Sequence, residues 1–434
     1  MPPRLHPLDR RIGRLAIPAL GALAADPLVS MVDTAFVGRL GVTPLAALGV
    51  NASIFSLAFV VFNFLAYGTT PMIARAVSRG DRERAGRLAV EALAVAVLAG
   101  AGALALLQLF AVPILALMGA TGALEAPALE YLRIRALAGP AVLLITAGHG
   151  IFRGWEDTRT PLVVTLGLNA VNLVLDPLLI FGLGWGLAGA AIATVIAQWA
   201  GAIGFLLLIL GPRRERLGVS PRVPSLRDLA PLVRVGGALL VRTLSLIGTL
   251  TLATAIATRL GALEVAAHQV ATQLWLLLAL VVDALAVAAQ ALVAGASPTD
   301  ARRVARRLLG WGLLVGVVLA ALFAGARPWL PRIFTDDPVA IQRVDALLGF
   351  VIWMQPLNAL VFVWDGIFMG AEDFRYLALQ MVLSGVAAAV VLLLVVPLGW
   401  GLTGVWWGLV ALMATRAVTL GLRHLRGTPA LPRS

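Results

Sequence analysis

The sequence predicts an all-α membrane protein with twelve transmembrane helices in two six-helix lobes. Its composition is the first indication, because 60% of its 434 residues are hydrophobic and only 13% are charged. A soluble protein of this size has about 25% charged residues. Apolar runs of about 17 to 25 residues, long enough to cross a bilayer, follow one another along the chain. An internal repeat then divides these runs into two sets of six.

The apolar pattern predicts each membrane span in turn. The first half of the chain contains six apolar runs bounded by arginines, glycines or prolines, and the second half contains six more. The predicted spans are 14–38, 44–74, 88–110, 129–151, 160–182, 187–211, 230–258, 264–294, 304–325, 341–369, 376–397 and 402–424.

The arginines indicate the orientation of these spans. The chain has a net charge of +12 and no lysine. With the N-terminus in the cytoplasm, 26 arginines are assigned to cytoplasmic segments and the adjoining span ends, 7 are assigned to the opposite side, and Arg242 is assigned to the interior of a span. Cytoplasmic connections are enriched in basic residues, so both termini are predicted to be cytoplasmic. The basic charge is therefore interpreted as a topology signal and a contact with anionic lipid headgroups, and not as a nucleic-acid site.

The internal repeat predicts a duplication of six helices. Three segments of the first half recur in the same order in the second half, at offsets of 220, 216 and 215 residues. An even number of spans per copy makes the two copies parallel, related by a pseudo-two-fold axis along the membrane normal. The expected organisation is an N-lobe at 1–211, a linker at 212–228 and a C-lobe at 229–434. The matching segments are 38–50 with 258–270, 150–159 with 366–375, and 182–191 with 397–406.

Several patterns suggest catalysis or cofactor binding, but they lack the surrounding structure or the residue spacing that such sites require. The G-x-G-x-x-G match at 184–189 lies between two membrane spans, and the repeat carries the same pattern at 399–404, as a structural turn would. The chain has no cysteine, and its four histidines lack metal-ligand spacing. We therefore expect no enzyme activity, no cofactor and no metal site. His268 is interpreted as a helix-packing or cavity residue.

Acidic residues inside the spans are the strongest functional signal. Asp26 and Asp33 are seven residues apart, hence on one helix face and about 10 Å apart along its axis. Asn169, Asn172 and Asp176 form a second stripe at spacings of three and four. A charged carboxylate is costly in lipid, whereas a protonated one is neutral and packs there more easily. Asp33 and Asp176 together predict a proton site.

Other polar residues in the spans permit two interpretations. They either hydrogen-bond one another as structural contacts between helices, or they line a substrate cavity. The candidates for the cavity in the first lobe, besides Asp26 and Asn169, are Asn51, Asn63, Tyr67 and Gln198. The second lobe contributes Arg242, Asp283 and Asp365; Arg242 is positioned to neutralise a carboxylate, and Asp365 lies near the predicted cytoplasmic end of its helix, within reach of solvent.

At these residues the chain resembles the multidrug and toxic compound extrusion (MATE) family, and its DinF-like branch in particular. The similarity runs from the first to the eleventh span. It is carried by "PLVSMVDTAFVGRLG", "GIFRGWEDTRTPL", "LNAVNLVLDPLLIFG", "RLGALEVAAHQV" and "WDGIFMGAEDFRYLA". The resemblance implies the MATE fold and an antiporter that exports drug-like compounds against inward flow of H⁺ or Na⁺.

The resemblance also implies roles for single residues. The acid of the family's "VDT" motif couples the ion and corresponds to Asp33. The Asn and Asp of the fifth helix correspond to Asn172 and Asp176, and a threonine of the sixth helix corresponds to Thr194. The NorM-like branch carries an acid in its seventh helix, and residues 236–258 of this chain contain none. A second-lobe cation site of that kind is therefore not expected.

These observations together predict a proton-coupled multidrug antiporter of the bacterial inner membrane. Its expected partners are small drug-like substrates, above all lipophilic cations, and membrane lipids, and the expected state is a monomer. Na⁺ remains an alternative coupling ion. A lipid-linked oligosaccharide flippase is a second hypothesis, disfavoured because Arg242 is the only arginine assigned to the interior of a span. A membrane scaffold without transport is a third, disfavoured by the acids inside the spans.

Overall fold

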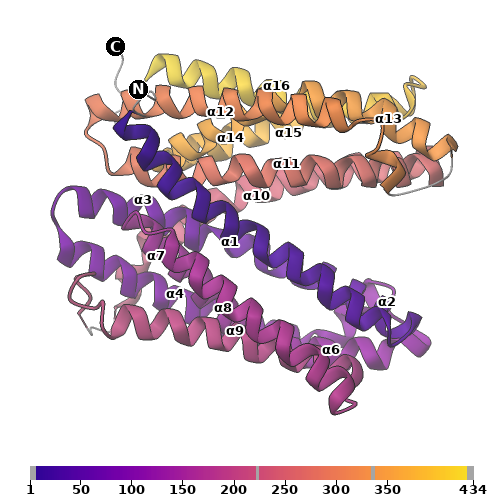
Figure 1. Ribbon diagram of the computed structural model, residues 1–434, viewed down its shortest axis with the longest axis horizontal. Coiled ribbons are helices and arrows are strands. Elements are labelled where there is room, and N and C mark those ends of the chain that lie inside the picture. Colours follow the sequence, from indigo (N-terminus) through magenta and orange to yellow (C-terminus); the bar gives the residue numbers. More distant parts are fainter. Residues whose placement is uncertain (1–5, 221–223, 334–337, 428–434) are drawn as a thin grey trace, which may run out of the picture. The chain divides into compact units, whose positions relative to one another are not determined.

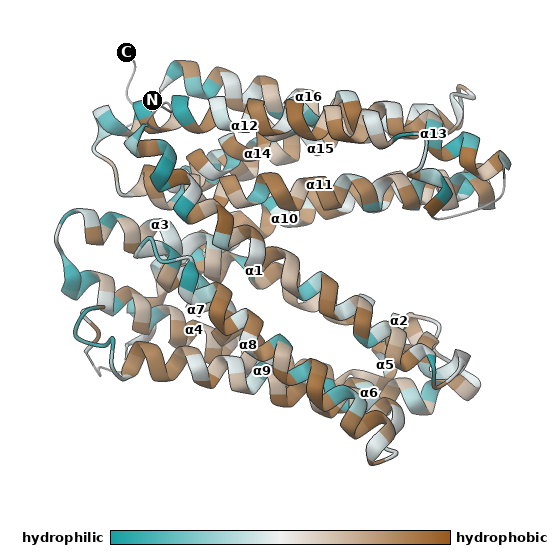
Figure 2. Cartoon of the chain, in the orientation of Figure 1, coloured by the Kyte–Doolittle hydropathy of each residue, from teal (hydrophilic) through white to brown (hydrophobic). Residues whose placement is uncertain are grey.

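The chain folds entirely into helices in the part that the structure describes. The computed structural model describes residues 6–220, 224–333 and 338–427, and no strand occurs among them. Ten helices are long and apolar enough to cross a membrane, or twelve spans result if each of two bent helix pairs counts as one. Figure 2 shows hydrophobic residues along most of each helix and hydrophilic residues concentrated towards the ends. This is the pattern expected for segments that cross hydrocarbon.

The helices group into two compact units. The first unit is Ile17–Gly236, and the second consists of the chain up to Ala16 together with the residues from Gly237 onward. The division falls within two helices, α1 (Pro7–Gly38) and α10 (Leu226–Leu260). It therefore does not coincide with the expected linker at 212–228. The expected lobes correspond to the two copies of the sequence repeat, whereas the two units are groups of residues that contact one another in the structure.

The first unit is formed by α1 to α9 with part of α10. In this unit α7 packs against both α3 and α4, and α8 packs against α9. The fourth predicted span is bent by 47° between α6 and α7. The elements after α1 are α2 (Val42–Val60), η1 (Val61–Asn63), α3 (Phe64–Ser78), α4 (Arg82–Leu109), α5 (Ala111–Leu117), η2 (Gly122–Leu124), α6 (Glu125–Ala136), α7 (Gly139–Gly154), α8 (Arg159–Pro177), the π-helical turn η3 (Leu178–Gly182) and α9 (Gly186–Leu210).

The second unit is formed by the remaining helices and the start of α1. Helix α14 packs against α11 and α12, and α15 packs along α16, as Figure 1 shows. The tenth predicted span is bent by 51°, at the break between α13 and α14. The elements after α10 are α11 (Ala262–Ala294), α12 (Pro298–Ala326), η4 (Pro331–Ile333), α13 (Pro338–Trp353), α14 (Gln355–Gly370), α15 (Phe374–Val395) and α16 (Gly401–Arg426).

Matching backbone conformations appear at matching positions of the two copies. Glu156 and Glu372, which are 216 residues apart, are the non-glycine residues with positive φ in the described chain, at 55° and 59°. The G-x-G-x-x-G segments also match, because the first two glycines of each have φ between 53° and 70°. Only glycine adopts such angles at low cost. These glycines form the turns that precede α9 and α16, which agrees with the structural interpretation of the motif.

Glycines at equivalent positions also allow close helix contacts. A Cβ atom on Gly150 of α7 would lie 2.9 Å from the carbonyl oxygen of Leu65 on α3. A Cβ atom on Gly366 of α14 would lie 2.5 Å from the carbonyl oxygen of Ala286 on α11. Small residues let membrane helices approach at backbone distance. The two copies therefore use the same packing device.

A buried ionic cluster connects three helices of the second unit. Asp365 of α14 pairs with Arg242 of α10 at 2.7 Å and with Arg416 of α16. Asp365 is 3% exposed and Arg416 is 1% exposed. Asp283 of α11 is within electrostatic range of Arg416. The expectation that solvent reaches Asp365 is therefore wrong, and Arg416, which the sequence count assigns to the cytoplasmic arginines, is buried within α16.

Replacing the shared carboxylate should destabilise the second unit. Asp365→Asn removes the counter-ion of the buried guanidinium group of Arg416 and of the partly buried group of Arg242. Removing one partner of a buried ion pair costs about 3–5 kcal/mol. The matched control is Asp345→Asn, which breaks a half-exposed pair with Arg327 at 2.7 Å and should cost less than about 1 kcal/mol. Thermal unfolding of the purified variants measures both. Equal unfolding temperatures for the two variants would show that the cluster is not a stabilising element.

Candidate functional site

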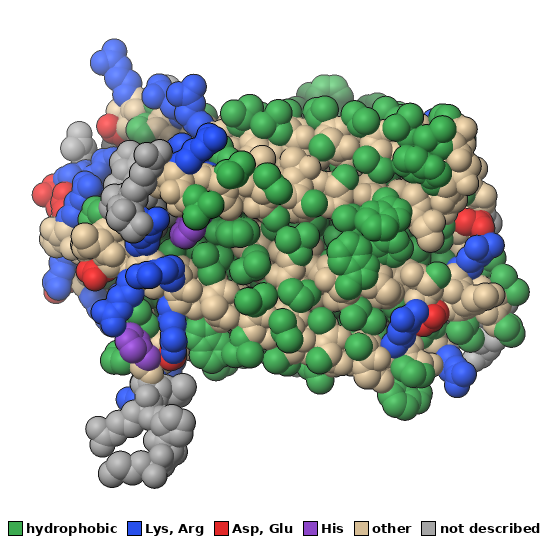
Figure 3. Space-filling model, turned by 90° about the horizontal axis from the view of Figure 1, so that it is seen from above, with side chains coloured by type: hydrophobic (Ala, Val, Ile, Leu, Met, Phe, Trp, Pro, Cys, Tyr) green, Lys and Arg blue, Asp and Glu red, His purple; other side chains and the backbone are tan. Residues whose placement is uncertain are grey.

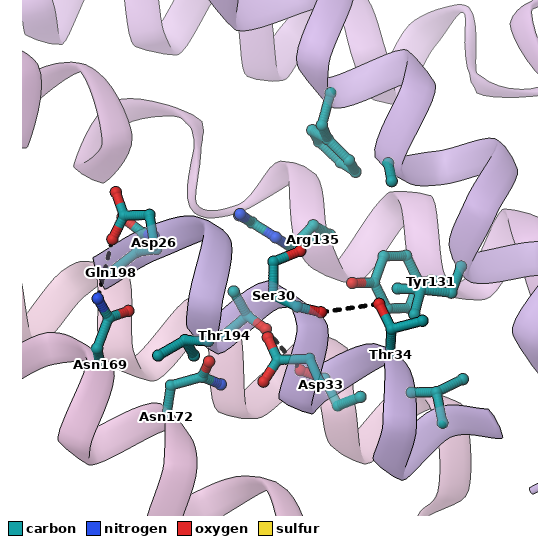
Figure 4. Close-up of a pocket in the computed structure, with 16 residues that line it drawn as sticks. Asp26, Ser30, Asp33, Thr34, Tyr131, Arg135, Asn169, Asn172, Thr194 and Gln198 are labelled. Carbon is teal, nitrogen blue, oxygen red and sulfur yellow. Dashed lines mark hydrogen bonds between the residues drawn. The ribbon is translucent and has the colours of Figure 1, made fainter. Parts of the chain in front are cut away.

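The first unit contains a polar cavity of about 290 Å³. Side chains from five helices line it, and Figure 4 shows the acidic, amide and hydroxyl groups directed towards the same space. Most of the intramembrane polar residues identified in the first lobe meet here. The lining residues are Asp26, Val29, Ser30, Asp33, Thr34, Val37, Leu48, Ala52, Phe55, Tyr131, Arg135, Asn169, Asn172, Ala190, Thr194 and Gln198.

One face of α1 supplies the acidic side of the cavity. Ser30, Asp33 and Thr34 follow Asp26 by four, seven and eight residues, so all four lie on one side of the helix. The hydroxyl of Thr34 donates to the carbonyl oxygen of Ser30 at 2.7 Å. Helix α1 continues through Pro27, which lacks the N–H group that would complete the helical hydrogen bond. Because α1 is not interrupted at Pro27, these polar side chains form one continuous face of the helix.

Asp33 and Asp176 come together beside the cavity. Asp33 lines the cavity, whereas Asp176 of α8 is fully buried and interacts electrostatically with Asp33. Neither carboxylate oxygen of Asp176 has a hydrogen-bond donor among the described residues, and Oδ1 of Asp33 has none either. An ionised carboxylate only accepts hydrogen bonds. A proton held between the two acids would supply the missing donor and remove one of two adjacent like charges.

Helices α8 and α9 supply the neutral polar groups. The side-chain amide of Asn169 donates to Oδ1 of Asp26 at 2.9 Å, as Figure 4 shows. Asn172 lies one turn before Asp176 on the same helix and faces the cavity. The hydroxyl of Thr194 donates to the carbonyl oxygen of Ala190 at 2.9 Å and also lines the cavity, as does Gln198. Acid, amide and hydroxyl groups therefore surround one small volume.

Two lining residues of α6 do not appear among the sequence candidates. Tyr131 and Arg135 lie four residues apart on one helix face and reach the cavity. The guanidinium group of Arg135 lies over the ring of Phe55, 5.2 Å from its centre. The arginine count assigns Arg135 to the non-cytoplasmic side; in the structure it lies within α6 and lines the cavity. The i, i+4 spacing of Tyr131 and Arg135 is the sequence feature that could have identified them as two polar residues on one helix face.

Three other candidates of the first lobe lie outside the cavity lining. Asn51 is fully buried, and its side-chain amide donates to the carbonyl oxygens of Ala47 at 2.9 Å and Ala128 at 3.0 Å. It therefore connects α2 to α6. Asn63 is exposed in η1, and Tyr67 lies partly buried in α3.

The remaining candidates belong to the second unit. Arg242 and Asp365 are members of the ionic cluster. The Nε2 atom of His268 lies 3.3 Å from the hydroxyl of Thr254, and its ring packs edge-on against Trp406. His268 is thus a packing residue in α11. No group of three or more His, Cys, Asp and Glu side chains suited to a metal ion occurs in the described part of the chain.

The chemistry of the cavity is confined to one copy of the repeat. The counterpart of Asp33 at an offset of 220 is Ala253, and the counterpart of Asp176 at an offset of 216 is Leu392. Both counterparts are completely buried in the second unit. The two copies share backbone turns and helix contacts but differ in their buried polar groups.

Curated proteins related to this chain come from plants and bacteria. Protein DETOXIFICATION 44, chloroplastic, of Arabidopsis thaliana is 37% identical in an alignment that covers 96% of this chain and 82% of the relative. DNA damage-inducible protein F of Escherichia coli K12 is 28% identical, covering 96% and 93%. A probable multidrug resistance protein NorM of Burkholderia mallei is 30% identical, covering 99% and 95%. The similarity therefore extends over nearly the whole chain.

Solved structures and a family model give the same assignment. A structure described as "Crystal structure of MATE in the bent conformation" aligns with a TM-score of 0.86 at 20% identity, covering 96% of this chain and 95% of the other. The predicted all-α fold with twelve membrane helices is thereby confirmed as the MATE fold. The MatE family model matches residues 18–178 and again 239–398, one match in each copy of the repeat. The chain is a multi-pass membrane protein and belongs to the MATE family of multidrug transporters.

Proposed function

We propose that the chain exports lipophilic, mostly cationic compounds across the bacterial inner membrane in exchange for protons. The observation that carries this proposal is the contact between Asp33 and Asp176 at the wall of the cavity. Asp176 is fully buried and Asp33 partly buried, and three of their four carboxylate oxygens have no donor among the described residues, so the pair gains stability from a bound proton. The same cavity offers a negative, partly apolar surface to a cation.

Competition between proton and substrate follows from the charges around the cavity. Asp26, Asp33 and Asp176 supply three carboxyl groups, and Arg135 supplies one permanent positive charge. With all three acids ionised the group is negative and attracts a cation. Each proton bound to the Asp33–Asp176 pair removes one negative charge and weakens that attraction. Proton uptake from outside would therefore release a cationic substrate, because the two ligands stabilise different charge states of one cavity.

Chemistry of the lining residues supports further parts of the proposal. Asn172 and Thr194 adjoin the acid pair and would orient the proton or its water partner. Asp26, held by Asn169 at 2.9 Å, would contact the substrate. Transport by a monomer is part of the same proposal. The excess of arginine in the segments assigned to the cytoplasm supports cytoplasmic termini, and the bacterial relatives support an inner-membrane location.

Sodium is the alternative coupling ion for the same residues. Carboxylate, amide and hydroxyl oxygens also suit a small hard cation. Substrate efflux from proteoliposomes, driven in turn by a pH gradient alone and by a Na⁺ gradient alone, separates the two. We expect efflux with the pH gradient only, and efflux driven by Na⁺ alone would reject proton coupling.

Asp33→Asn should abolish proton-driven efflux while the protein still folds. The amide cannot release a proton, so the pair loses its exchangeable charge. The matched control is Asp26→Asn, which removes a carboxylate from the same cavity but leaves the pair intact. It should weaken binding of a cationic dye yet preserve substrate-induced proton release. Proton release by purified Asp33→Asn equal to that of the wild type would contradict the assignment.

The two acids should behave as one unit. If Asp33 and Asp176 share a proton, Asp176→Asn should impair the same step, and the double variant should transport within about twofold of the worse single variant, because residues that act together give non-additive losses. Asn172→Ala should impair this step too. Initial rates of proton-driven efflux measure the effect. Fully additive losses would place the acids in separate sites.

Arg135→Gln should tighten binding of a cationic substrate. Loss of the positive charge at the cavity removes a repulsion of roughly 2 kcal/mol for charges about 8 Å apart at an effective dielectric constant near 20, equivalent to about thirtyfold in affinity. The matched control is Arg133→Gln, which removes an exposed arginine two residues away on α6. Equilibrium binding of a fluorescent cation measures both. An unchanged or weaker affinity of Arg135→Gln would show that Arg135 does not face the bound substrate.

A further inference from the structure

A second cavity, of about 440 Å³, lies in the second unit where the start of α1 meets the turn between α11 and α12. It shares no lining residue with the polar cavity of the first unit. On the face shown in Figure 3, arginine side chains concentrate at one end of the molecule and hydrophobic side chains cover the middle. The cavity is lined by His6, Pro7, Leu8, Arg11, Leu292, Gly295, Ala296, Ser297, Asp300, Arg303 and Val304.

Positive groups dominate the lining of this cavity. Arg11 and Arg303 contribute two guanidinium groups, and His6 contributes an imidazole. The single acid is Asp300, whose Oδ2 accepts a hydrogen bond from the hydroxyl of Ser297 at 2.6 Å. Ser297 is also the N-cap of α12, a helix of 29 residues. The helix dipole therefore adds partial positive charge at the same place.

The hydrogen bonds of His6 indicate a missing acceptor. Its Nδ1 atom accepts from the backbone N–H of Leu8 at 3.2 Å, and its Nε2 atom lies 3.2 Å from Nη2 of Arg303. A neutral imidazole has only one nitrogen that accepts, and arginine only donates. With Nδ1 accepting, Nε2 carries hydrogen and faces another donor. An anion beside these two groups would accept a hydrogen bond from each.

The neighbouring contacts hold the cavity walls in place without a ligand. The guanidinium group of Arg307 donates two hydrogen bonds of 2.6 Å to Asp9, and the indole N–H of Trp311 donates a third at 2.8 Å. These bonds fix the first turn of α1 against α12. The donors of His6, Arg11 and Arg303 are therefore gathered before any anion binds, which reduces the cost of binding.

We propose that this cavity binds a phosphate group, supplied either by the headgroup of an anionic phospholipid or by soluble phosphate. Guanidinium groups bind phosphate oxygens through paired, charge-assisted hydrogen bonds. The segments that form the cavity are among those assigned to the cytoplasmic side, where anionic headgroups lie. The proposal concerns binding alone and does not depend on the coupling residues of the other cavity.

Titrations of the purified full-length protein test the proposal. The probes are dihexanoyl phosphatidylglycerol, its zwitterionic phosphatidylcholine analogue and inorganic phosphate, and the readout is the shift in unfolding temperature. Arg303→Gln should weaken binding of the anionic probe by about tenfold, the loss expected for one charge-assisted contact. The matched control is Arg306→Gln, which removes an exposed arginine of α12 outside the cavity and should change binding by less than about twofold.

Each outcome of these titrations decides the proposal. Stabilisation by phosphatidylglycerol but not by inorganic phosphate supports a lipid headgroup, and stabilisation by inorganic phosphate supports a soluble ligand. Superimposable titrations for Arg303→Gln and Arg306→Gln would overturn the proposal, because general surface charge would then explain the binding. If Arg303→Gln does not fold, Arg11→Gln takes its place with the same expected loss. Absence of any shift in the wild type, combined with no phospholipid retained in native mass spectra, would also overturn it.

Discussion

Hydrocarbon provides no hydrogen-bond partners, and this constraint governs the fold. Every backbone amide within the membrane has to be paired inside its own helix, so the chain consists of helices joined by short turns. Buried polar side chains must likewise find partners inside the protein. Asn51 does so with two carbonyl oxygens, and Asp365 does so with two arginines. Both carboxylate oxygens of Asp176 and Oδ1 of Asp33 lack a donor among the described residues, which is why a proton is the natural partner for that pair.

Duplication preserved backbone geometry and changed buried chemistry. Positive φ angles recur at Glu156 and Glu372, and close glycine contacts recur at Gly150 and Gly366. These features depend on the path of the backbone, so a change at one of them would disturb a whole turn or helix pair. Buried polar groups are less restricted, because an acid in one copy can become alanine or leucine in the other if its partner changes as well. The copies therefore share a scaffold but not a site.

Helix α1 contributes to both compact units. Its first turn is fixed to α12 through Asp9, Arg307 and Trp311, while Asp26 and Asp33 further along line the cavity of the first unit. A single helix thus carries a structural anchor and the proposed coupling acid. The proposed phosphate site is lined by residues on either side of Asp9, so a bound phosphate would contact the same end of α1.

The sequence by itself determined the twelve apolar spans, the duplication and the face of each helix that carries polar groups. Helical periodicity made Asp26 and Asp33 share one stripe, and Asn169, Asn172 and Asp176 another. Only the tertiary structure decided which stripes meet. It brought Asp176 to Asp33, added Tyr131 and Arg135 to the cavity, and directed Asn51 towards α6. It also buried Arg416 against Asp365. Periodicity is a local property of one helix, whereas the partner of a side chain depends on the packing of residues tens to hundreds of positions away.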